Sequence, residues 1–190
     1  LISKQNGHIS QEIKIPFKEK KFLSQIKKTG ENNGQAVIGA GPGRYYSIFP
    51  FNDNWILSEL SSDTVYTCMP DYSLHPFIAR TPSIQSMNPE EGLIIRLFSD
   101  RYYFMESIKN IYDWDTQEGF PSKYFMYDTK EQSFSGYTVY NGDFTTKKEI
   151  YMSMIKPINH EIASWYSLEA YQLVESYNKG ELKGILKEIA

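Results

Sequence analysis

The chain has 190 residues, and its 23 acidic residues outnumber its 20 lysines and arginines, which gives a formal net charge of −3 at neutral pH. This length fits one sizeable domain, and the lack of a basic excess argues against a nucleic-acid partner. The only cysteine, Cys68, excludes an intrachain disulfide bond and a thiolate metal cluster. No apolar stretch approaches the roughly 18 residues that a membrane-spanning helix needs, so we expect no membrane span.

Tyrosine and phenylalanine are abundant, with 15 and 11 copies, and aromatic side chains favour the half-buried surface of β-strands. The first strands are expected within residues 1–15, on either side of Asn6-Gly7, because both residues tolerate the positive φ of a tight hairpin turn. Residues 16–43 have no steady hydrophobic period, and they predict a long excursion with one strand at 36–38.

Two groups of four short strands come next, with polar turns between the strands. The strands of the first group are expected at residues 45–51, 55–60, 65–69 and 74–79. Those of the second group are expected at residues 93–98, 101–107, 123–127 and 134–140, with an insertion at 108–121 after the second strand. Short strands joined by tight turns predict an up-and-down antiparallel meander in each group.

A repeated segment relates the two groups. Residues 51–59 read FNDNWILSE and residues 98–106 read FSDRYYFME, so the phenylalanine, aspartate, aromatic, apolar and glutamate positions recur after 47 residues. In this alignment Glu59 corresponds to Glu106, and we expect both acids to end their strands at the same height. A repeated four-stranded unit is typical of a β-propeller, in which each blade packs its faces against the next blade.

The end of the chain has a different pattern. Further strands are expected at 149–158 and 161–165, whereas Ser167 can cap a helix that Gly180 ends. Apolar residues with helical spacing follow this cap in two stretches, which are Leu168, Tyr171, Val174 and Tyr177, and then Leu182, Ile185, Leu186 and Ile189.

We therefore predict an all-β fold, a partial β-propeller of about three four-stranded antiparallel blades, with a short C-terminal helical segment. The blades are expected to cover residues 1–166, and the helices at 167–190 to pack on the same domain.

Residues that carry chemistry are sparse. The histidines His8, His75 and His160 have no metal-ligand spacing to another histidine, cysteine or acid, so we expect no metal site, no cofactor and no catalytic residue. The stretch DWDTQEG at 113–119 places oxygen-bearing side chains at alternate positions, as in a calcium loop. Glu118, however, stands where that loop needs glycine, so a solvated insertion anchored by its tryptophan is the favoured interpretation.

Six residues are candidate ligand-binding residues, because arginine and large aromatic side chains dominate binding hot spots. They are expected on loops between blades and on the insertion, at the face where such loops converge in a propeller: Arg44, Arg80, Tyr112, Asp113, Trp114 and Asp115. An alternative interpretation gives the two arginines a structural role, in which they tie blades together through Asp63 or Glu90.

Several long phrases of the sequence are distinctive, among them PGRYYSIFPFNDNWILSELSSDTVY, SDRYYFMESIKNIYDWDTQEGFPSKYFMYD and SWYSLEAYQLVESYNKGELKGILKEIA. They resemble the C-terminal half of a family of bacterial six-bladed β-propeller proteins that is abundant in gut commensals. Members of that family are usually predicted lipoproteins or otherwise exported, and the family has no assigned function. The resemblance implies a periplasmic or outer-surface location, with a lipid anchor carried by a segment that is not present in this sequence.

Together these features predict a non-enzymatic binding or scaffolding module whose ligand is a glycan, a peptide or a partner protein. The alternative is a propeller-type hydrolase or lyase whose catalytic residues lie partly in a missing N-terminal half. Because a half-ring leaves blade faces uncovered, we also expect self-association through those faces, or completion by the missing half.

Overall fold

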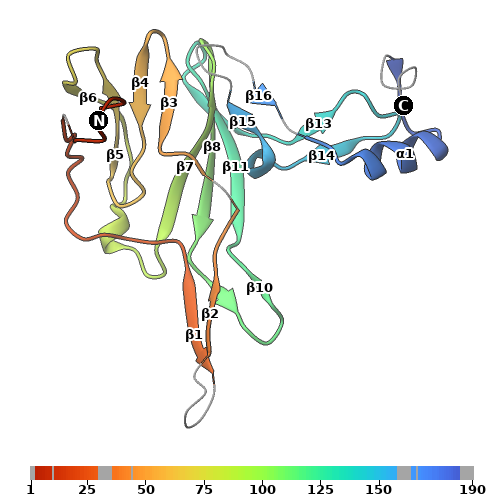
Figure 1. The fold of residues 1–190 in the computed structure, drawn as a ribbon, viewed down its shortest axis with the longest axis horizontal. Helices are drawn as coiled ribbons and strands as arrows, with labels where there is room; N and C mark the ends of the chain where they lie inside the picture. Colours follow the sequence, from red (N-terminus) through yellow and green to blue (C-terminus); the bar gives the residue numbers. More distant parts are fainter. Residues whose placement is uncertain are drawn as a thin grey trace. The chain divides into compact units, whose positions relative to one another are not determined.

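The computed structural model of this chain describes residues 3–9, 11–29, 36–43, 45–157, 164–165 and 167–184 (Figure 1). These residues form mostly β-structure, in several small antiparallel sheets, with a single α-helix in the described part of the chain. The chain divides into two compact units. Unit 1 comprises Leu1–Pro42, Tyr46–Ile94 and Ser107–Ser122, and unit 2 comprises Gly43–Tyr45, Ile95–Glu106 and Lys123–Ala190.

The first four-stranded sheet lies in unit 1 and is a meander, in which each strand pairs antiparallel with the next along the chain. Its strands are β3 (Ile48–Phe51), β4 (Asn54–Leu57), β5 (Thr64–Cys68) and β6 (Leu74–Ala79). Asn52 and Asp53 adopt positive φ in the turn between β3 and β4. Asparagine and aspartate tolerate this conformation, which lets the chain reverse within two residues.

The second four-stranded sheet has the same order of consecutive strands, and its first two strands contribute residues to both units. Its strands are β7 (Glu91–Phe98), β8 (Tyr102–Lys109), β11 (Ser122–Asp128) and β12 (Ser133–Gly136). The insertion forms a separate hairpin of β9 (Tyr112–Asp113) and β10 (Glu118–Gly119) between β8 and β11. The two predicted meanders are confirmed, whereas their stacking as blades around a propeller axis stays a prediction.

The turn between the first two strands of the second sheet lies one residue later in the repeat than that of the first sheet, and this breaks the predicted equivalence of Glu59 and Glu106. Residues 52–53 separate β3 from β4, whereas residues 99–101 separate β7 from β8. A shift of one residue along a strand moves side chains to the opposite face. Glu59 lies beyond the end of β4 and is half-buried, while Glu106 lies inside β8 and is buried. The prediction that both acids end their strands at the same height is wrong.

The N-terminal strand prediction is also wrong for the described residues. Residues 3–9 form a turn in which Gly7 has a φ of +71° and Ser3 N donates to His8 O at 2.8 Å. Apart from a bridge at Ile9, residues 3–9 and 11–15 form no strand. Farther along, β1 (Gln25–Thr29) pairs with β2 (Ala36–Ala40), so the strand expected at 36–38 is present and its partner was missed.

Unit 2 continues with two short hairpins and one 3-10 turn. The strands are β13 (Val139–Asn141), β14 (Lys148–Ile150), β15 (Lys156–Pro157) and β16 (Ser164–Trp165). A 3-10 turn, η2 (Met152–Met154), falls inside the strand predicted at 149–158. Another, η1 (Ile84–Ser86), lies in unit 1 after β6.

The helix α1 (Ala170–Asn178) lies in unit 2, and its N-cap is Glu169 rather than Ser167. The Gln172 side chain accepts a hydrogen bond from the Glu169 N–H while the Glu169 side chain accepts one from the first turn, so the two residues form a capping box. Gly180 follows the helix with a φ of +68°, which suits a helix end. No helix among the described residues combines the length and apolar character that crossing a membrane requires.

Most of the second stretch of apolar residues with helical spacing cannot be compared with the structure, because Ile185, Leu186 and Ile189 lie outside the described residues. Its first residue, Leu182, is described and forms an isolated antiparallel bridge with Phe144 instead of a helical turn. Both side chains are buried, at 3% and 2% exposure, so this bridge attaches the segment after α1 to the region between β13 and β14.

A cluster of buried aliphatic side chains forms part of the core of unit 1, and its members are Leu23, Leu60, Ile94 and Ile108, with Phe120 packed against them. Gly92 of β7 makes room for this cluster. A Cβ at that position would lie 2.7 Å from Leu60 Cδ1 and 2.8 Å from Leu23 Cδ1, which are impossible contacts. The cluster therefore fixes the segment that precedes β1 against the strands of unit 1.

Candidate functional site

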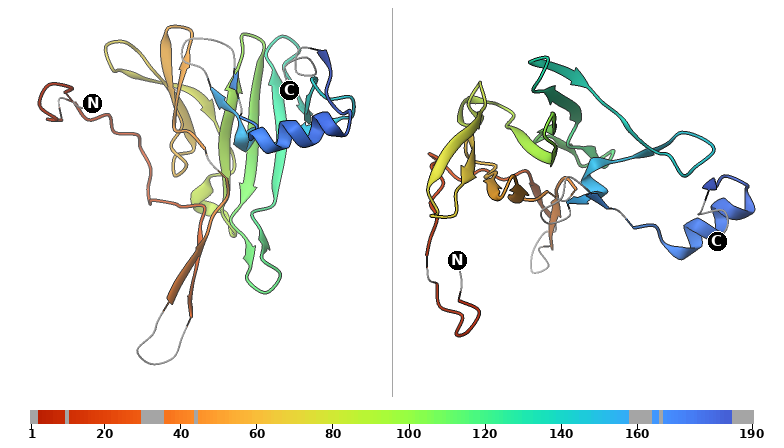
Figure 2. Two further views of the ribbon diagram at one scale, coloured as in Figure 1. Left: turned by 45° about the vertical axis from the view of Figure 1, so that its right-hand side comes forward. Right: turned by 90° about the horizontal axis from the view of Figure 1, so that it is seen from above.

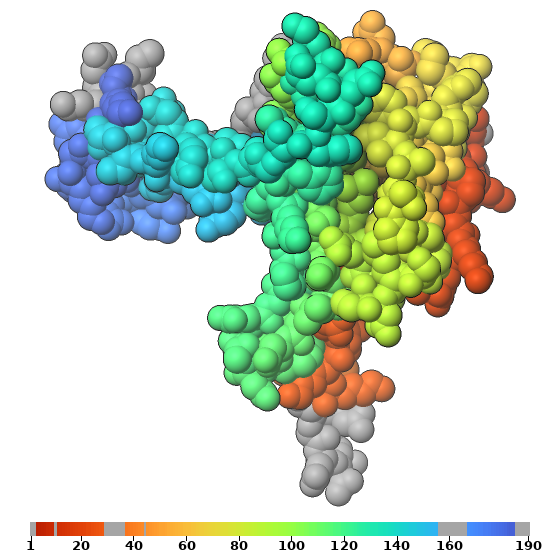
Figure 3. Space-filling model, turned by 180° about the vertical axis from the view of Figure 1, so that it is seen from behind, coloured from red at the N-terminus to blue at the C-terminus, as the bar shows by residue number. Residues whose placement is uncertain are grey.

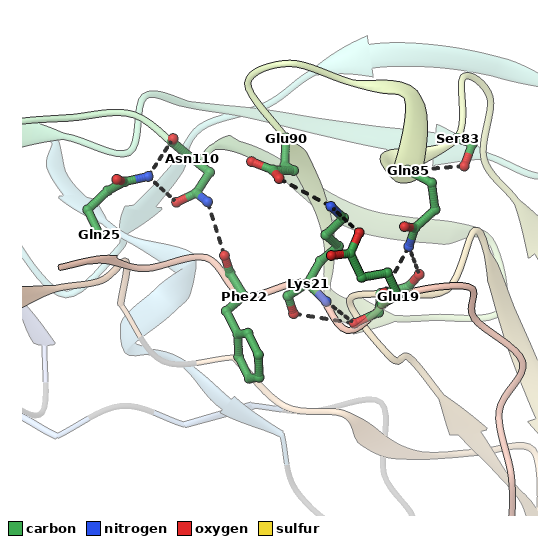
Figure 4. A network of polar contacts seen from close by, with 9 residues as sticks. Glu19, Lys21, Phe22, Gln25, Ser83, Gln85, Glu90 and Asn110 are labelled. Carbon is green, nitrogen blue, oxygen red and sulfur yellow. Dashed lines mark hydrogen bonds and ion pairs between the residues drawn. The ribbon is translucent and has the colours of Figure 1, made fainter.

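Three segments that are distant in sequence meet in unit 1, as Figure 4 shows. Lys21 Nζ lies 2.9 Å from Glu19 Oε2 and 3.5 Å from Glu90 Oε1. Gln85 Nε2 donates to the backbone oxygens of Glu19, at 3.0 Å, and of Ser61, at 3.2 Å. The hydrogen bond to the Glu19 carboxylate raises the pKa of Lys21, so the ammonium stays charged at neutral pH. We call this set of contacts the junction.

Asn110, the residue after β8 and just before the inserted hairpin, completes the junction. Its Nδ2 donates to Phe22 O at 3.0 Å, and its backbone N–H donates to Glu90 O at 2.8 Å. Gln25 Nε2 donates to both the backbone oxygen and Oδ1 of Asn110, at 3.0 and 3.1 Å. Because Gln25 begins β1, these hydrogen bonds tie the base of the β1–β2 hairpin to the base of the β9–β10 hairpin.

Residues 111–120, which contain β9, β10 and their turn, are called the aromatic hairpin from here on. Its turn is ordered by Asp113, whose Oδ1 accepts hydrogen bonds from the N–H groups of Asp115, at 2.8 Å, and Thr116, at 3.2 Å. These two donors lower the pKa of Asp113, so its carboxylate is ionised at neutral pH. An aspartate that bonds backbone groups two and three residues ahead stabilises a turn without any distant contact.

Three aromatic rings pack on one another in this hairpin. The ring of Tyr112 meets that of Trp114 edge to face, with centroids 4.8 Å apart, and that of Phe120 at 5.6 Å. Gly119, which pairs with Tyr112, allows this approach, since a Cβ there would lie 2.4 Å from Tyr112 Cδ2. The tyrosine and tryptophan rings are half-buried, whereas Asp113 and Asp115 are exposed, so the hairpin presents ring surface next to carboxylates.

The structure brings four of the six candidate residues together and leaves Arg80 apart from them. Tyr112, Asp113, Trp114 and Asp115 all belong to the aromatic hairpin, while Arg44 lies outside the described residues.

Arg80 follows β6, and its Nε lies 3.9 Å from Asp63 Oδ1. Its Nη2 donates to Glu91 O, and burial lowers its pKa. Asp63 also accepts a hydrogen bond from the Ile84 N–H at 2.7 Å. This geometry favours the structural interpretation of Arg80, which fixes the connection between the two four-stranded sheets.

A local arrangement of acid, serine and histidine was missed in the sequence. Ser73 Oγ lies 2.6 Å from Asp71 Oδ1 and 3.2 Å from His75 Nε2. Asp71 and Ser73 are in the turn before β6, and His75 is the second residue of that strand. The hydroxyl has one proton, which it donates to Asp71, and this hydrogen bond lowers the pKa of the carboxyl group. A nucleophilic serine must instead donate to the histidine, which an acid orients from its other side. The arrangement therefore stabilises a turn and does not form a catalytic triad.

A buried ion pair in unit 2 was also missed. Arg96 Nε donates to Glu106 Oε2 at 2.7 Å, and both side chains are 4% exposed. The nearby Tyr137 hydroxyl is buried and has no hydrogen-bond partner among the described residues, and burial raises its pKa. The Tyr137 hydroxyl therefore stays protonated at neutral pH, and the Glu106 carboxylate is paired with Arg96. Neither group is available as a base or a nucleophile.

Among the residues that the structure describes, no group of three or more histidines, cysteines and acids is arranged to hold a metal ion. Comparisons of the chain with protein-family models, with curated proteins and with solved structures yielded no match. The resemblance to a six-bladed propeller family therefore stays a prediction, and the functional argument depends on the geometry of the aromatic hairpin.

Proposed function

We propose that this chain is a non-enzymatic binding or scaffolding module of an exported β-propeller protein, and that the aromatic hairpin is its principal contact surface. One observation carries the proposal. The hairpin is ordered by its own contacts, yet part of the Trp114 ring and the carboxylates of Asp115 and Glu118 are exposed and take no part in those contacts. The hairpin extends from unit 1 in the same direction as the β1–β2 hairpin, as the views in Figure 1 and Figure 2 show. Figure 3 shows it (green, residues 111–120) standing out at the surface.

The anchoring of the hairpin supports a role in recognition. Phe120 packs against the aliphatic cluster of unit 1, and Asn110 joins the junction, so both ends of the aromatic hairpin are held. A two-stranded hairpin alone is marginally stable in water, and this one has only four paired residues. The contacts at its two ends supply the additional stability that keeps it ordered. A rigid binding element loses less conformational entropy when a ligand binds, which raises its affinity.

The test is substitution of Trp114 by alanine in the whole chain, followed by screening of both proteins against a panel of glycans, peptides and candidate partner proteins. We expect the variant to lose the ligands that the wild-type chain captures. Its circular dichroism should stay unchanged, and its free energy of unfolding should fall by no more than about 1 kcal/mol, the contribution of the lost ring contact with Tyr112. Identical binding profiles of the two well-folded proteins would refute the assignment of the hairpin as the contact surface. The proposed periplasmic or outer-surface location is tested by fractionation of cells that express the full open reading frame.

The proposal also includes self-association, and it is supported by the apolar side chains on both faces of the β3–β6 sheet. Phe49 and Ile56 pair on one face and are buried, at 3% and 0% exposure. Ile48 and Trp55 lie on the other face, because side chains alternate along a strand, and they are 57% and 40% exposed. A sheet that is apolar on both faces is built to be covered on both. We infer that a second copy of this chain covers the exposed face.

Self-association is measured by gel filtration with light scattering at micromolar concentration. We expect a dimer or larger species that the Trp55→Lys substitution converts to monomer, because a lysine at this position places a charge in the apolar contact. A clean wild-type monomer would overturn this part of the proposal and leave ligand binding at the aromatic hairpin unaffected.

A further inference from the structure

The aromatic hairpin uses several of its backbone N–H groups internally and leaves two of its carboxylates without a partner among the described residues. The N–H groups of Asp115 and Thr116 donate to Asp113, and that of Glu118 donates to Thr116 Oγ1 at 3.4 Å. The N–H of Phe120 donates to Ile111 O at 2.6 Å. By contrast, the carboxylates of Asp115 and Glu118 make no hydrogen bond or ion pair with any described residue. A ligand that suits these two carboxylates brings hydroxyl or N–H donors to them.

The ring surface beside these acceptors suits a ligand with polarised C–H bonds. The edge-to-face contact with Tyr112 fixes the Trp114 indole, which remains partly exposed. An aromatic face carries partial negative charge and attracts the slightly positive hydrogens of a C–H face. A sugar ring has such a face, and hydroxyl donors surround it, so it can stack on the indole while it donates to the carboxylates.

The charge of the hairpin excludes anionic ligands. Residues 111–120 contain three acids, Asp113, Asp115 and Glu118, and no lysine or arginine. Phosphates, sulfated sugars and nucleic acids would be repelled from this surface, since like charges at close range oppose binding. A neutral glycan meets no such penalty and uses both features of the site, the ring face and the acceptors.

We propose that the aromatic hairpin binds a neutral carbohydrate, with Trp114 as the stacking platform and Asp115 as an acceptor of sugar hydroxyls. This inference specifies the ligand class of the binding function proposed above and rests on it. A cationic peptide, which could also approach the acids and the ring, is the competing ligand.

The experiment uses the full chain and three probes: neutral oligosaccharides of glucose, mannose and xylose, a lysine-rich peptide, and a sulfated polysaccharide. Affinities are measured by calorimetry at about 50 mM and about 500 mM salt, a range that screens interactions between exposed charges. Trp114→Ala is compared with Tyr171→Ala, which removes an exposed aromatic side chain from α1 and serves as the matched control. Asp115→Asn removes the charge and keeps one acceptor oxygen, whereas Asp115→Ala removes both.

We expect at least one neutral oligosaccharide to bind, with an affinity that changes less than about threefold with salt. Trp114→Ala should weaken this binding at least about tenfold, as for a residue at a binding hot spot, while Tyr171→Ala leaves it unchanged. Asp115→Asn should weaken it less than Asp115→Ala, because the amide oxygen still accepts a hydroxyl.

Binding of the lysine-rich peptide alone, with loss at high salt and in both Asp115 variants, would overturn the carbohydrate inference and preserve the binding function of the hairpin. Binding of the sulfated polysaccharide alone would overturn it as well. No binding of any probe, or binding that the Trp114→Ala and Tyr171→Ala variants retain equally, would overturn both the ligand class and the hairpin as the contact surface.

Discussion

Leu23 is the side chain through which the segment before β1 enters the core of unit 1, and its removal tests that attachment. It is 6% exposed and packs with Leu60, Ile94 and Ile108. The Leu23→Ala substitution removes three buried carbons, about 2.4 kcal/mol at about 0.8 kcal/mol each, and a residual cavity raises the expected loss to about 3 kcal/mol. With a urea m-value of about 2 kcal/mol per molar, the unfolding midpoint should fall by about 1.5 M.

Gly92 supplies the complementary half of this test. Gly92→Ala brings a Cβ within 3 Å of both Leu23 and Leu60, so overpacking should cost about 1–3 kcal/mol in the wild-type background. In the Leu23→Ala background one of those two clashes is gone. The double variant should therefore lose about 1 kcal/mol less unfolding free energy than the two single variants lose in total. Urea unfolding of all four proteins measures this coupling. Additive losses, or a Leu23→Ala loss below about 1 kcal/mol, would refute the packing described here.

Three further predictions concern polar contacts. Hydrogen bonds from Arg101 lower the pKa of Asp128 to about 2, so this contact stabilises the fold fully above the usual pKa near 3.8, and the stabilisation is lost as the pH falls toward 2. In thermal melts, the difference in melting temperature between the wild-type protein and Asp128→Asn should therefore shrink between pH 3.8 and 2. A difference that is constant with pH would contradict the stabilising contact between Arg101 and Asp128. Arg96→Met alone leaves Glu106 buried and unpaired and should cost about 3–5 kcal/mol, whereas adding Glu106→Leu should restore most of the stability in urea unfolding. Asn110→Ala should speed amide hydrogen exchange in both the β1–β2 hairpin and the aromatic hairpin, and it should lower the free energy of unfolding by about 1–3 kcal/mol. Unchanged exchange rates would contradict the role of Asn110 in joining the bases of the two hairpins.

Much of the fold could be predicted because the two meanders depend on short-range signals. The turn at Asn52-Asp53 and the apolar runs of β3 and β4 are both visible within a few residues. The failure for Glu59 and Glu106 has an equally local cause. Repeat alignment assumes that both turns fall at the same place in the repeat. Ser99 N donates to Tyr102 O at 2.9 Å, so the second turn lies one residue later than the first, and one acid meets Lys20 at 2.6 Å while the other is buried with an arginine.

Other features depend on contacts that a linear pattern does not contain. The segment Gln25–Thr29 has little apolar character, and β1 is held in place by Leu23 in the core and by the hydrogen bonds of Gln25 to Asn110, a residue 85 positions away. The helix cap moved from Ser167 to Glu169 because Gln172, three residues later, completes a reciprocal pair that serine at 167 cannot make with it.

The candidate site was predictable to the extent that it is contiguous in sequence, and this same contiguity makes it testable. The turn of the aromatic hairpin is ordered by its own Asp113, and its ends are fixed by Asn110 and Phe120, so folding requires neither the carboxylate of Asp115 nor the exposed part of Trp114. Side chains that folding does not use can be replaced without loss of the fold, and a change in binding then reports on recognition alone. For Arg80 the reverse holds, because the guanidinium that could meet a ligand already bonds Glu91 and lies beside Asp63, and its loss would disturb the connection between the sheets.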